Sequence, residues 1–171
     1  TVAAVCGSSS SNEGNVAAPL PLSRTLRAGF HTQDPGVRIV HCVRDPMDTI
    51  LSCYFQAFKS PLAWSNRLDW SAHYYRQYQR IMRHWERVLS SSMYTLHYES
   101  LVAQPETSIR SLLEYCSIPF HPSVLKHHES DRVVATASYA QANRPIYTSS
   151  AGKSVKYARH LQVVKDILEA K

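Results

Sequence analysis

The chain of 171 residues lacks the short motifs that mark the commonest nucleotide, protease and hydrolase sites. It has no Walker A loop, no G-x-G-x-x-G fingerprint, no H-E-x-x-H pair and no G-x-S-x-G elbow. Its four cysteines form no C-x-x-C pair and their spacing resembles no zinc site, so we expect buried free thiols and no metal centre.

Long apolar runs and basic clusters are also missing. No apolar run approaches the roughly 20 residues that span a membrane, and residues 1–6 are too short and uncharged for a signal peptide. The net charge of +6 is spread along the chain without a run of five basic residues. It favours anionic partners, among them a nucleotide, sulfate, nucleic acid or an acidic peptide, without choosing among them.

The stretch Val37–Phe58 is the most informative part of the chain. The run Val37–Val43 is apolar and rich in β-branched residues, which predicts a buried parallel strand. Asp45 is a good N-cap and Pro46 suits a first helical position, so we expect a helix that continues to about Phe58. The sequence therefore predicts strand, tight turn and helix, with an arginine at the end of the strand where ligands bind in open α/β sheets.

The remaining residues predict an α/β domain that follows a poorly ordered or divergent N-terminal arm of residues 1–35. Two strands do not make a stable open sheet, so either a strand lies undetected within residues 1–30 or the chain is a piece of a larger domain. The expected elements are a helix Asp69–Leu89, a strand Met93–Tyr98, and helices Pro105–Cys116, Ser123–Glu129 and Lys153–Ala170. The apolar faces of the first and last helix would be formed by Trp70, Tyr74, Tyr78, Ile81, Trp85 and Leu89, and by Val155, Leu161, Val164, Ile167 and Leu168.

Three groups of residues are candidates for a site. Arg44 offers a planar donor fork and Ser52 a hydroxyl two turns into the helix, and Tyr98-Glu99 ends the second predicted strand. A polar loop, Ser138–Lys156, surrounds Gly152, which can take a positive φ and let backbone N–H groups converge on an anion. Each signal alone has a structural alternative, since an arginine after a strand can simply pair with a carboxylate.

Two further groups are more readily explained by structure than by chemistry. His41 lies inside the strand and is expected to be a packed histidine. Four arginines at helical spacing favour a solvated helix face over a phosphate-binding stripe, and they are Arg76, Arg80, Arg83 and Arg87.

Taken in order, these motifs resemble sulfotransferases that use 3′-phosphoadenosine 5′-phosphosulfate (PAPS). Arg44-Asp45-Pro46-Met47-Asp48, with a serine eight residues after the arginine, resembles the family's 3′-phosphate motif. HYESLVAQPETSIRSLLEYCSIPF resembles its Y-E-x-L-x-x-x-P-E segment and the following L-G-[IL]-P-F turn. The polar loop is similar to the closing loop of the tetratricopeptide-associated branch, and more distantly of tyrosylprotein sulfotransferases, through Ser138, Gln141, Arg144-Pro145 and Lys153. The resemblance covers about residues 36–168.

The resemblance implies a fold, a co-substrate and roles for residues. The fold would be P-loop-kinase-like, with a partial parallel sheet flanked by helices, and residues 36–171 would be its C-terminal part. The co-substrate would be PAPS, without a metal, and the acceptor a hydroxyl, with protein tyrosine in an acidic peptide as one candidate. Cofactor binding would fall to Arg44, Ser52, Tyr98, Ser138, Gln141, Arg144 and Lys153, and Ser138 and Lys153 would act on the transferring group.

The chain also departs from the family pattern. The P-[KR]-S-G-T-[ST] loop that holds the 5′-phosphosulfate is not found, because Cys6-Gly7-Ser8-Ser9-Ser10 lacks the basic residue and the threonine. The segment that normally supplies the catalytic base is missing with it, and Ser154 stands where an aromatic residue is frequent. One alternative is therefore an inactive PAP(S)-binding fragment or paralogue. The other is a basic RNA- or heparin-binding domain, whereas the sulfotransferase interpretation expects no nucleic-acid partner.

Overall fold

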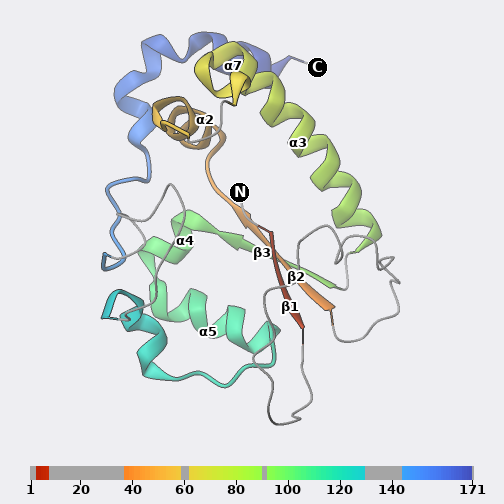
Figure 1. The fold of residues 1–171 in the computed structure, drawn as a ribbon, viewed down its shortest axis with the longest axis vertical. Helices are drawn as coiled ribbons and strands as arrows, with labels where there is room; N and C mark the ends of the chain where they lie inside the picture. Colours follow the sequence, from red (N-terminus) through yellow and green to blue (C-terminus); the bar gives the residue numbers. More distant parts are fainter. Residues whose placement is uncertain (1–2, 8–36, 59–61, 90–91, 130–143, 171) are drawn as a thin grey trace.

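The protein is seen here as a computed structural model that describes residues 3–7, 37–58, 62–89, 92–129 and 144–170. Three strands form one sheet in the order β1-β2-β3 (Figure 1). The central strand β2 (Val37–Val43) pairs in parallel with β3 (Met93–His97), with Ile39 opposite Met93. The strand predicted at Val37–Val43 is thus confirmed, and so is an α/β fold with a small parallel sheet flanked by helices.

The third strand lies within the segment predicted as an arm. β1 (Ala3–Gly7) pairs with the other edge of β2 in antiparallel fashion, with Ala3 opposite His41. The expectation of an undetected strand within residues 1–30 is confirmed, and the sheet is mixed rather than all parallel. The strand β3 is one residue shorter than predicted, because Tyr98 already begins a helix.

Helix α2 (Pro46–Phe55) begins as its sequence predicts. The Asp45 side chain accepts a hydrogen bond of 2.8 Å from the backbone N–H of Asp48, and Pro46 occupies the first helical turn. The helix ends at Phe55, three residues before the predicted end, because the N–H of Gln56 bonds to the carbonyl of Cys53 and the backbone becomes extended. The α2 N-terminus therefore follows directly from the end of β2.

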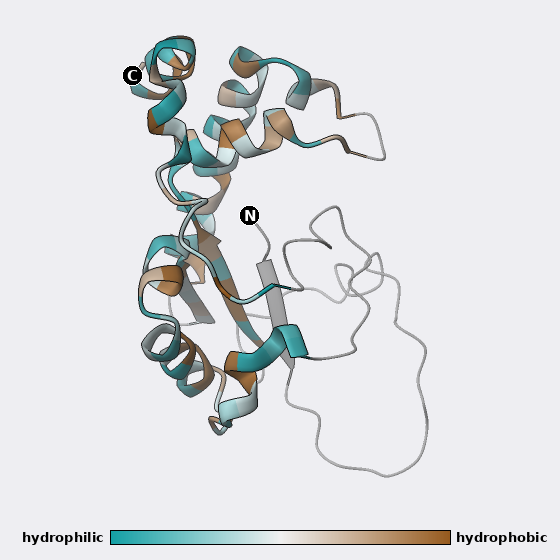
Figure 2. Cartoon of the chain, turned by 90° about the vertical axis from the view of Figure 1, so that its left-hand side faces the viewer, coloured by the Kyte–Doolittle hydropathy of each residue, from teal (hydrophilic) through white to brown (hydrophobic). Residues whose placement is uncertain are grey.

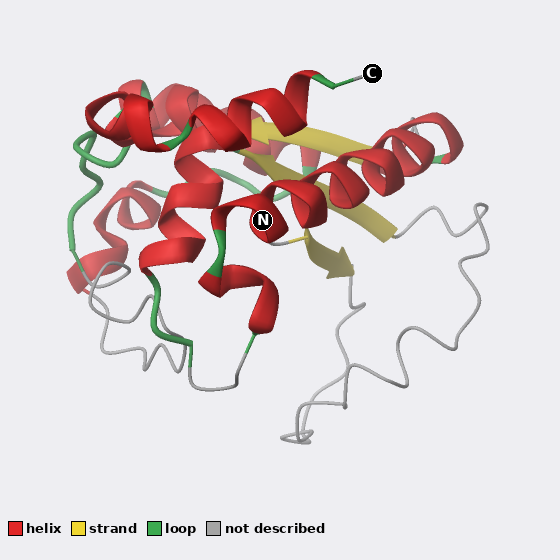
Figure 3. Ribbon diagram, turned by 90° about the horizontal axis from the view of Figure 1, so that it is seen from above, coloured by secondary structure: helices red, strands yellow, loops and turns green. Residues whose placement is uncertain are grey.

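The other helices lie on the two sides of the sheet (Figures 1 and 3). On one side Tyr115 donates to the carbonyl of Ile39 over 3.4 Å and stacks on Tyr94, which attaches α5 to the sheet. On the other side the hydroxyl of Tyr78 in α3 contacts His41 of β2. The described helices besides α2 are η1 (Ala63–Asn66), α3 (Leu68–Val88), α4 (Tyr98–Ala103), α5 (Pro105–Tyr115), η3 (Pro122–Glu129), η4 (Lys153–His160) and α7 (Gln162–Glu169).

The main hydrophobic core lies between helices rather than against the sheet. Side chains from α2, α3 and the start of α7 are buried together, with further apolar residues packed around them. Strand β2 is largely hydrophobic (Figure 2) and buries Ile39 and Val40, and β3 buries Leu96. The buried residues of the helical core are Ile50, Leu51, Ala72, Tyr75, Leu161 and Val164.

Helix α3 is confirmed in position, but its predicted apolar face is only partly confirmed: Leu89 is buried and Tyr78 packs against the core, whereas other members of the face are exposed. Trp70, Tyr74 and Ile81 are about half exposed, whereas Ser71 and Ala72 are buried. Small residues on α3 allow close approach to α2 and α7, so the bulky aromatic residues turn outward. Tyr74 instead stacks on Trp64 of η1, with ring centres 4.4 Å apart. None of the described helices is long and apolar enough to cross a membrane.

The last predicted helix is two helices. The helix is interrupted at Leu161, whose N–H bonds to the carbonyls of Tyr157 and Ala158. Helix η4 therefore ends there, and α7 begins at the next residue. Leu161 and Val164 are buried as predicted, but Val155 is 75% exposed. Because of this break, η4 contacts α2 and α7 packs against α3.

Candidate functional site

The side chain of Arg44 lies where three separate segments meet at the end of β2. Its Nη2 donates to the carbonyl of Ser150 over 2.5 Å and lies 3.7 Å from Oδ2 of Asp48. Its guanidinium carbon sits 4.9 Å from the centre of the Tyr98 ring, a cation–π distance. The side chain is 22% exposed, and its buried Nε has no hydrogen-bond partner in the described part of the chain. Arg44 is therefore held in place while part of its donor capacity stays unused.

Asp48 joins the turn Arg44-Asp45-Pro46, called the RDP turn below, to the polar loop. Its carboxylate is buried and accepts two backbone hydrogen bonds, from Gly152 over 2.6 Å and from Ser154 over 2.7 Å. Burial alone would raise its pKa, but the hydrogen bonds from Ser154 and Gly152 and the charge of Arg44 hold the pKa below its usual value. Asp48 is therefore an ionised anchor that fixes a segment 106 residues further along the chain.

The predicted role of Gly152 holds in its geometry but differs in the anion. Gly152 adopts a φ of +70°, and nearby backbone N–H groups do converge on a negative charge. That charge is the protein's own Asp48 carboxylate, so these N–H groups are already used. The glycine thus positions the loop rather than offering donors to a ligand.

The turn and helix α4 are tied together at the same place. The backbone N–H of Asp45 donates to Oε1 of Glu99 over 2.8 Å, one residue after Tyr98. This bond holds the start of α4 against the turn and keeps the Tyr98 ring over the guanidinium of Arg44. The motifs around Arg44 and Tyr98, separated by more than 50 residues in sequence, are therefore neighbours in space.

Other predicted site residues are spread around this cluster. Ser52 is exposed on α2, and Lys153 is exposed at the start of η4 with its Nζ 5.5 Å from the ring of Phe55. Arg144 is exposed, and its carbonyl accepts a hydrogen bond of 3.1 Å from Nε2 of His127. Ser138 and Gln141 lie outside the described residues. The structure thus brings together Arg44, Tyr98 and the end of the polar loop.

Sequence reasoning missed Asp48 as a site residue. A signal was present, because Asp48 stands three residues after the N-cap Asp45 and four after Arg44, so it falls in the first turn of α2. An aspartate there is commonly read as a favourable charge for the helix dipole. Only the position of the distant loop shows that this carboxylate holds Gly152 and Ser154.

The arginine face of α3 is partly occupied by its own helix. Nε of Arg83 donates to the carbonyl of Gln79, and Nε of Arg87 to the carbonyl of Arg83, each one turn earlier. These bonds lay the side chains along the helix, which supports the interpretation as a solvated face. Among the described residues no group of three or more histidine, cysteine or acidic side chains could hold a metal ion.

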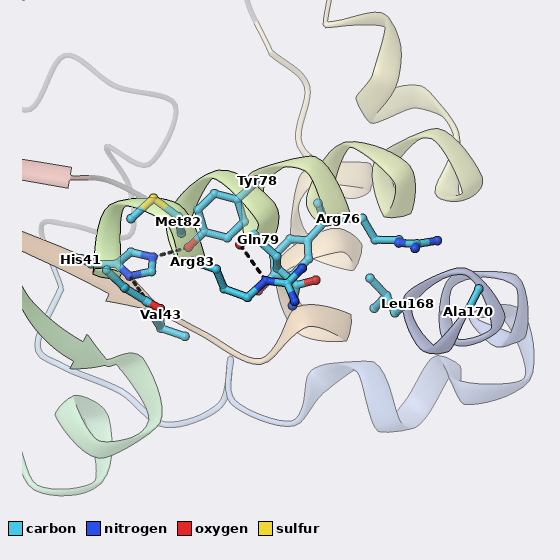
Figure 4. A pocket seen from close by; sticks show the side chains of 11 residues that line it. His41, Val43, Arg76, Tyr78, Gln79, Met82, Arg83, Leu168 and Ala170 are labelled. Carbon is cyan, nitrogen blue, oxygen red and sulfur yellow. Dashed lines mark hydrogen bonds and ion pairs between the residues drawn. The ribbon is translucent and has the colours of Figure 1, made fainter. Parts of the chain in front are cut away.

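Two cavities border α3, and neither is lined by Arg44. One of about 450 Å³ is lined by Val43, Arg76 and Arg83 and reaches the C-terminal end of α7 (Figure 4). The other, of about 510 Å³, is more apolar and is bordered by Trp64 and Ile81. Both cavities are lined by His41, Tyr75, Tyr78 and Met82. Arg44 therefore lies outside both of these cavities, which are lined mainly by residues of α3.

The half-buried thiols of Cys42 and Cys53 are weak candidates for a nucleophile. Burial raises the pKa of Cys42 and of Cys53, so both stay protonated at neutral pH. His41 is 3% exposed, so its predicted burial in the strand is confirmed.

Comparison with known proteins adds the following. The family model described as the sulfotransferase family matches residues 30–122, just over half of the chain. An uncharacterized protein of Aquifex aeolicus (strain VF5) is 33% identical over 138 residues, which cover 79% of this chain and 18% of that protein. The chain thus spans less than a fifth of the length of this relative.

Proposed function

Since this chain belongs to the sulfotransferase family, we propose that it binds PAPS at the Arg44 cluster and serves the transfer of the sulfuryl group to a hydroxyl acceptor. The matched residues include the whole of the RDP turn, α2 and the Tyr98-Glu99 segment. They also end before the polar loop. The family match therefore covers the turn, and the polar loop is included because Asp48 holds its Gly152 and Ser154.

The observation that carries the proposal is the state of Arg44. A guanidinium has five N–H donors, and one of its nitrogens serves a neutral carbonyl while Nε has no partner in the described residues. Asp48 is near enough to keep the side chain oriented, but at 3.7 Å it is not a hydrogen-bonded fork. A 3′-phosphate can take the remaining donors in the bidentate manner that arginine favours.

The neighbouring residues fit the other parts of a nucleotide. The Tyr98 ring, placed by the Asp45–Glu99 bond, can contact the nucleotide next to its phosphate. Ser52 adds a hydroxyl from the exposed face of α2. The polar loop would close over PAPS with Gln141 and Arg144, pinned at its far end by Asp48.

The transfer step would use the loop as well. Sulfuryl transfer develops charge on the bridging oxygen of the leaving phosphosulfate, and donors aimed there lower the barrier. We assign this role to Ser138 and Lys153, and loss of one such donor typically costs ~10²-fold or more in rate. The acceptor is proposed to be a hydroxyl, with protein tyrosine as the first class to assay. A chain that binds PAP without turnover is the alternative within the same site.

Calorimetry with PAP tests the binding site. Arg44→Lys keeps the charge beside Asp48 but removes the planar fork, and charge-assisted hydrogen bonds are worth about 1.5–3 kcal/mol each. We expect the Kd for PAP to rise roughly 10- to 100-fold at 1.4 kcal/mol per tenfold. Arg110→Lys, which alters an exposed arginine paired with Glu106 on α5, is the matched control and should leave PAP affinity unchanged.

Equal PAP affinity in Arg44→Lys and the parent protein would remove the site assignment. Transfer of radioactive sulfate from PAPS to a tyrosine peptide then separates enzyme from binding protein, because the binding-only alternative predicts PAP affinity without product.

A further inference from the structure

A second polar centre lies on β2, three residues before Arg44, and the mechanism above does not use it. His41 is 3% exposed, and its Nε2 forms a hydrogen bond with the hydroxyl of Tyr78 (Figure 4). Its Nδ1 lies 3.5 Å from Oε1 of Glu86 and has no hydrogen-bond partner among the described residues. Hydroxyl, imidazole and carboxylate thus follow one another in that order.

The protonation state of the imidazole suits acceptance of a proton. Burial lowers the pKa of His41, and the carboxylate of Glu86 opposes this only in part, so the ring is neutral at neutral pH. Glu86 favours the tautomer with hydrogen on Nδ1, which leaves Nε2 to accept from the Tyr78 hydroxyl. A long base–carboxylate contact is common before a ligand binds and shortens as charge develops on the ring.

This arrangement has the form of an activated nucleophile. A hydroxyl within hydrogen-bond reach of a base, with the base oriented by a third group, is the general sign of nucleophilic catalysis. The neighbouring Tyr75 differs, because His41 makes no hydrogen bond to it in the described contacts.

The surroundings of Tyr78 favour an anionic reaction partner. Tyr78 lines the cavity of about 450 Å³ together with Glu86 and two arginines, Arg76 and Arg83, which lie two turns apart on α3. Val43 lines the same cavity and directly precedes Arg44. His41, which also lines this cavity, lies three residues before Arg44, a distance of about 10 Å along a strand. The cavity therefore begins near a nucleotide anchored at Arg44.

We propose that Tyr78 is a sulfuryl acceptor of this chain, with His41 as its base and Glu86 as the group that orients His41. The proposal rests on PAPS binding at Arg44 and adds a covalent sulfotyrosine inside the protein. No residue of the polar loop is required for the acceptor side of this step.

The step balances without any further reactant. The Tyr78 oxygen forms a bond to sulfur as the bond from sulfur to the bridging phosphate oxygen breaks. The electron pair stays on that oxygen and PAP leaves, while the phenolic proton moves to Nε2 of His41. The imidazolium then faces Glu86 and later returns its proton to water. Arg76 and Arg83 offset the negative charge of the sulfuryl oxygens.

Incubation with PAPS that carries radioactive sulfur, followed by peptide mass spectrometry, tests the proposal. We expect sulfate on the peptide that contains Tyr78 and its absence in Tyr78→Phe, which keeps the ring and its packing. His41→Gln should slow labelling by about 10²-fold, a typical contribution of a general base. Tyr74→Phe, on the same helix but stacked on Trp64, is the matched control and should be labelled like the parent protein.

Each outcome decides one statement. PAP affinity measured on the same samples reports both folding and the Arg44 site. If PAP binds and Tyr78 stays unlabelled, the inference fails while the proposed function stands. Label that persists in Tyr78→Phe, or that disappears in Tyr74→Phe, overturns the inference too. If PAP does not bind to the parent protein, the proposed function itself fails.

Discussion

Two regions of the molecule differ in how their polar and apolar groups are paired: the cluster of Arg44, Asp48 and Tyr98, and the surroundings of α3. In the Arg44 cluster a buried carboxylate is saturated by two backbone N–H groups, and the turn is bonded to α4. Along α3 large aromatic residues are exposed, and the buried Nδ1 of His41 has no hydrogen-bond partner in the part of the chain that the structure describes. The first region holds Arg44 in a fixed position, whereas the second presents exposed aromatic side chains beside two cavities.

The largest difference between the two regions should appear on removal of Asp48. Asp48→Ala leaves the N–H groups of Gly152 and Ser154 and the charge of Arg44 without their partner, which typically costs about 3 kcal/mol. We expect that decrease in the free energy of unfolding, measured with urea. The control is Asp69→Ala, because its ion pair with Arg67 is shorter, at 2.7 Å, but exposed. If both variants lose the same stability, Asp48 is not the anchor of the loop.

A smaller difference should appear in the dependence of stability on pH. The pKa of Asp48 and that of His41 are both lowered, so in each case the unfolded chain binds protons more readily and acid destabilises the fold. The windows differ: stability from His41 is lost as pH falls below 6.5, and that from Asp48 only as pH falls below 3.8. Urea unfolding of His41→Gln on both sides of pH 6.5 should show a flatter profile than the parent. An unchanged slope would mean that His41 is not buried neutral.

The smallest effect is expected at Gly152. A Cβ added there meets nothing within 4 Å, so Gly152→Ala costs only the left-handed backbone, about 1 kcal/mol. Ser117 has a φ of +54° at the end of α5, so Ser117→Gly is the opposite experiment and should be neutral or slightly stabilising. Thermal unfolding measures both. A Gly152→Ala loss as large as that of Asp48→Ala would show that the substitution breaks the anchor as well.

Local signals predicted much of the fold and part of the candidate site. The strand at Val37–Val43, the cap at Asp45 and the start of α5 at Pro105 each depend on a few adjacent residues, and the structure confirms them. The predicted α3 face is only partly confirmed because tertiary packing preferred Ser71 and Ala72 to Trp70 and Tyr74. The prediction of one helix over Lys153–Ala170 missed the break at Leu161, because the helical spacing of apolar residues continues from η4 into α7.

The sequence by itself determined the strand–turn–helix around Arg44, because capping, proline placement and β-branched runs act over a few residues. It also determined the order of the motifs that resemble a PAPS site. Only the tertiary structure decided that Asp48 holds Gly152 and Ser154, and that Tyr78 lies against His41. The contacts of Asp48 with Gly152 and Ser154 span 104 and 106 positions in sequence, and the contact of His41 with Tyr78 spans 37. No local pattern encodes which distant partner a buried polar group will find.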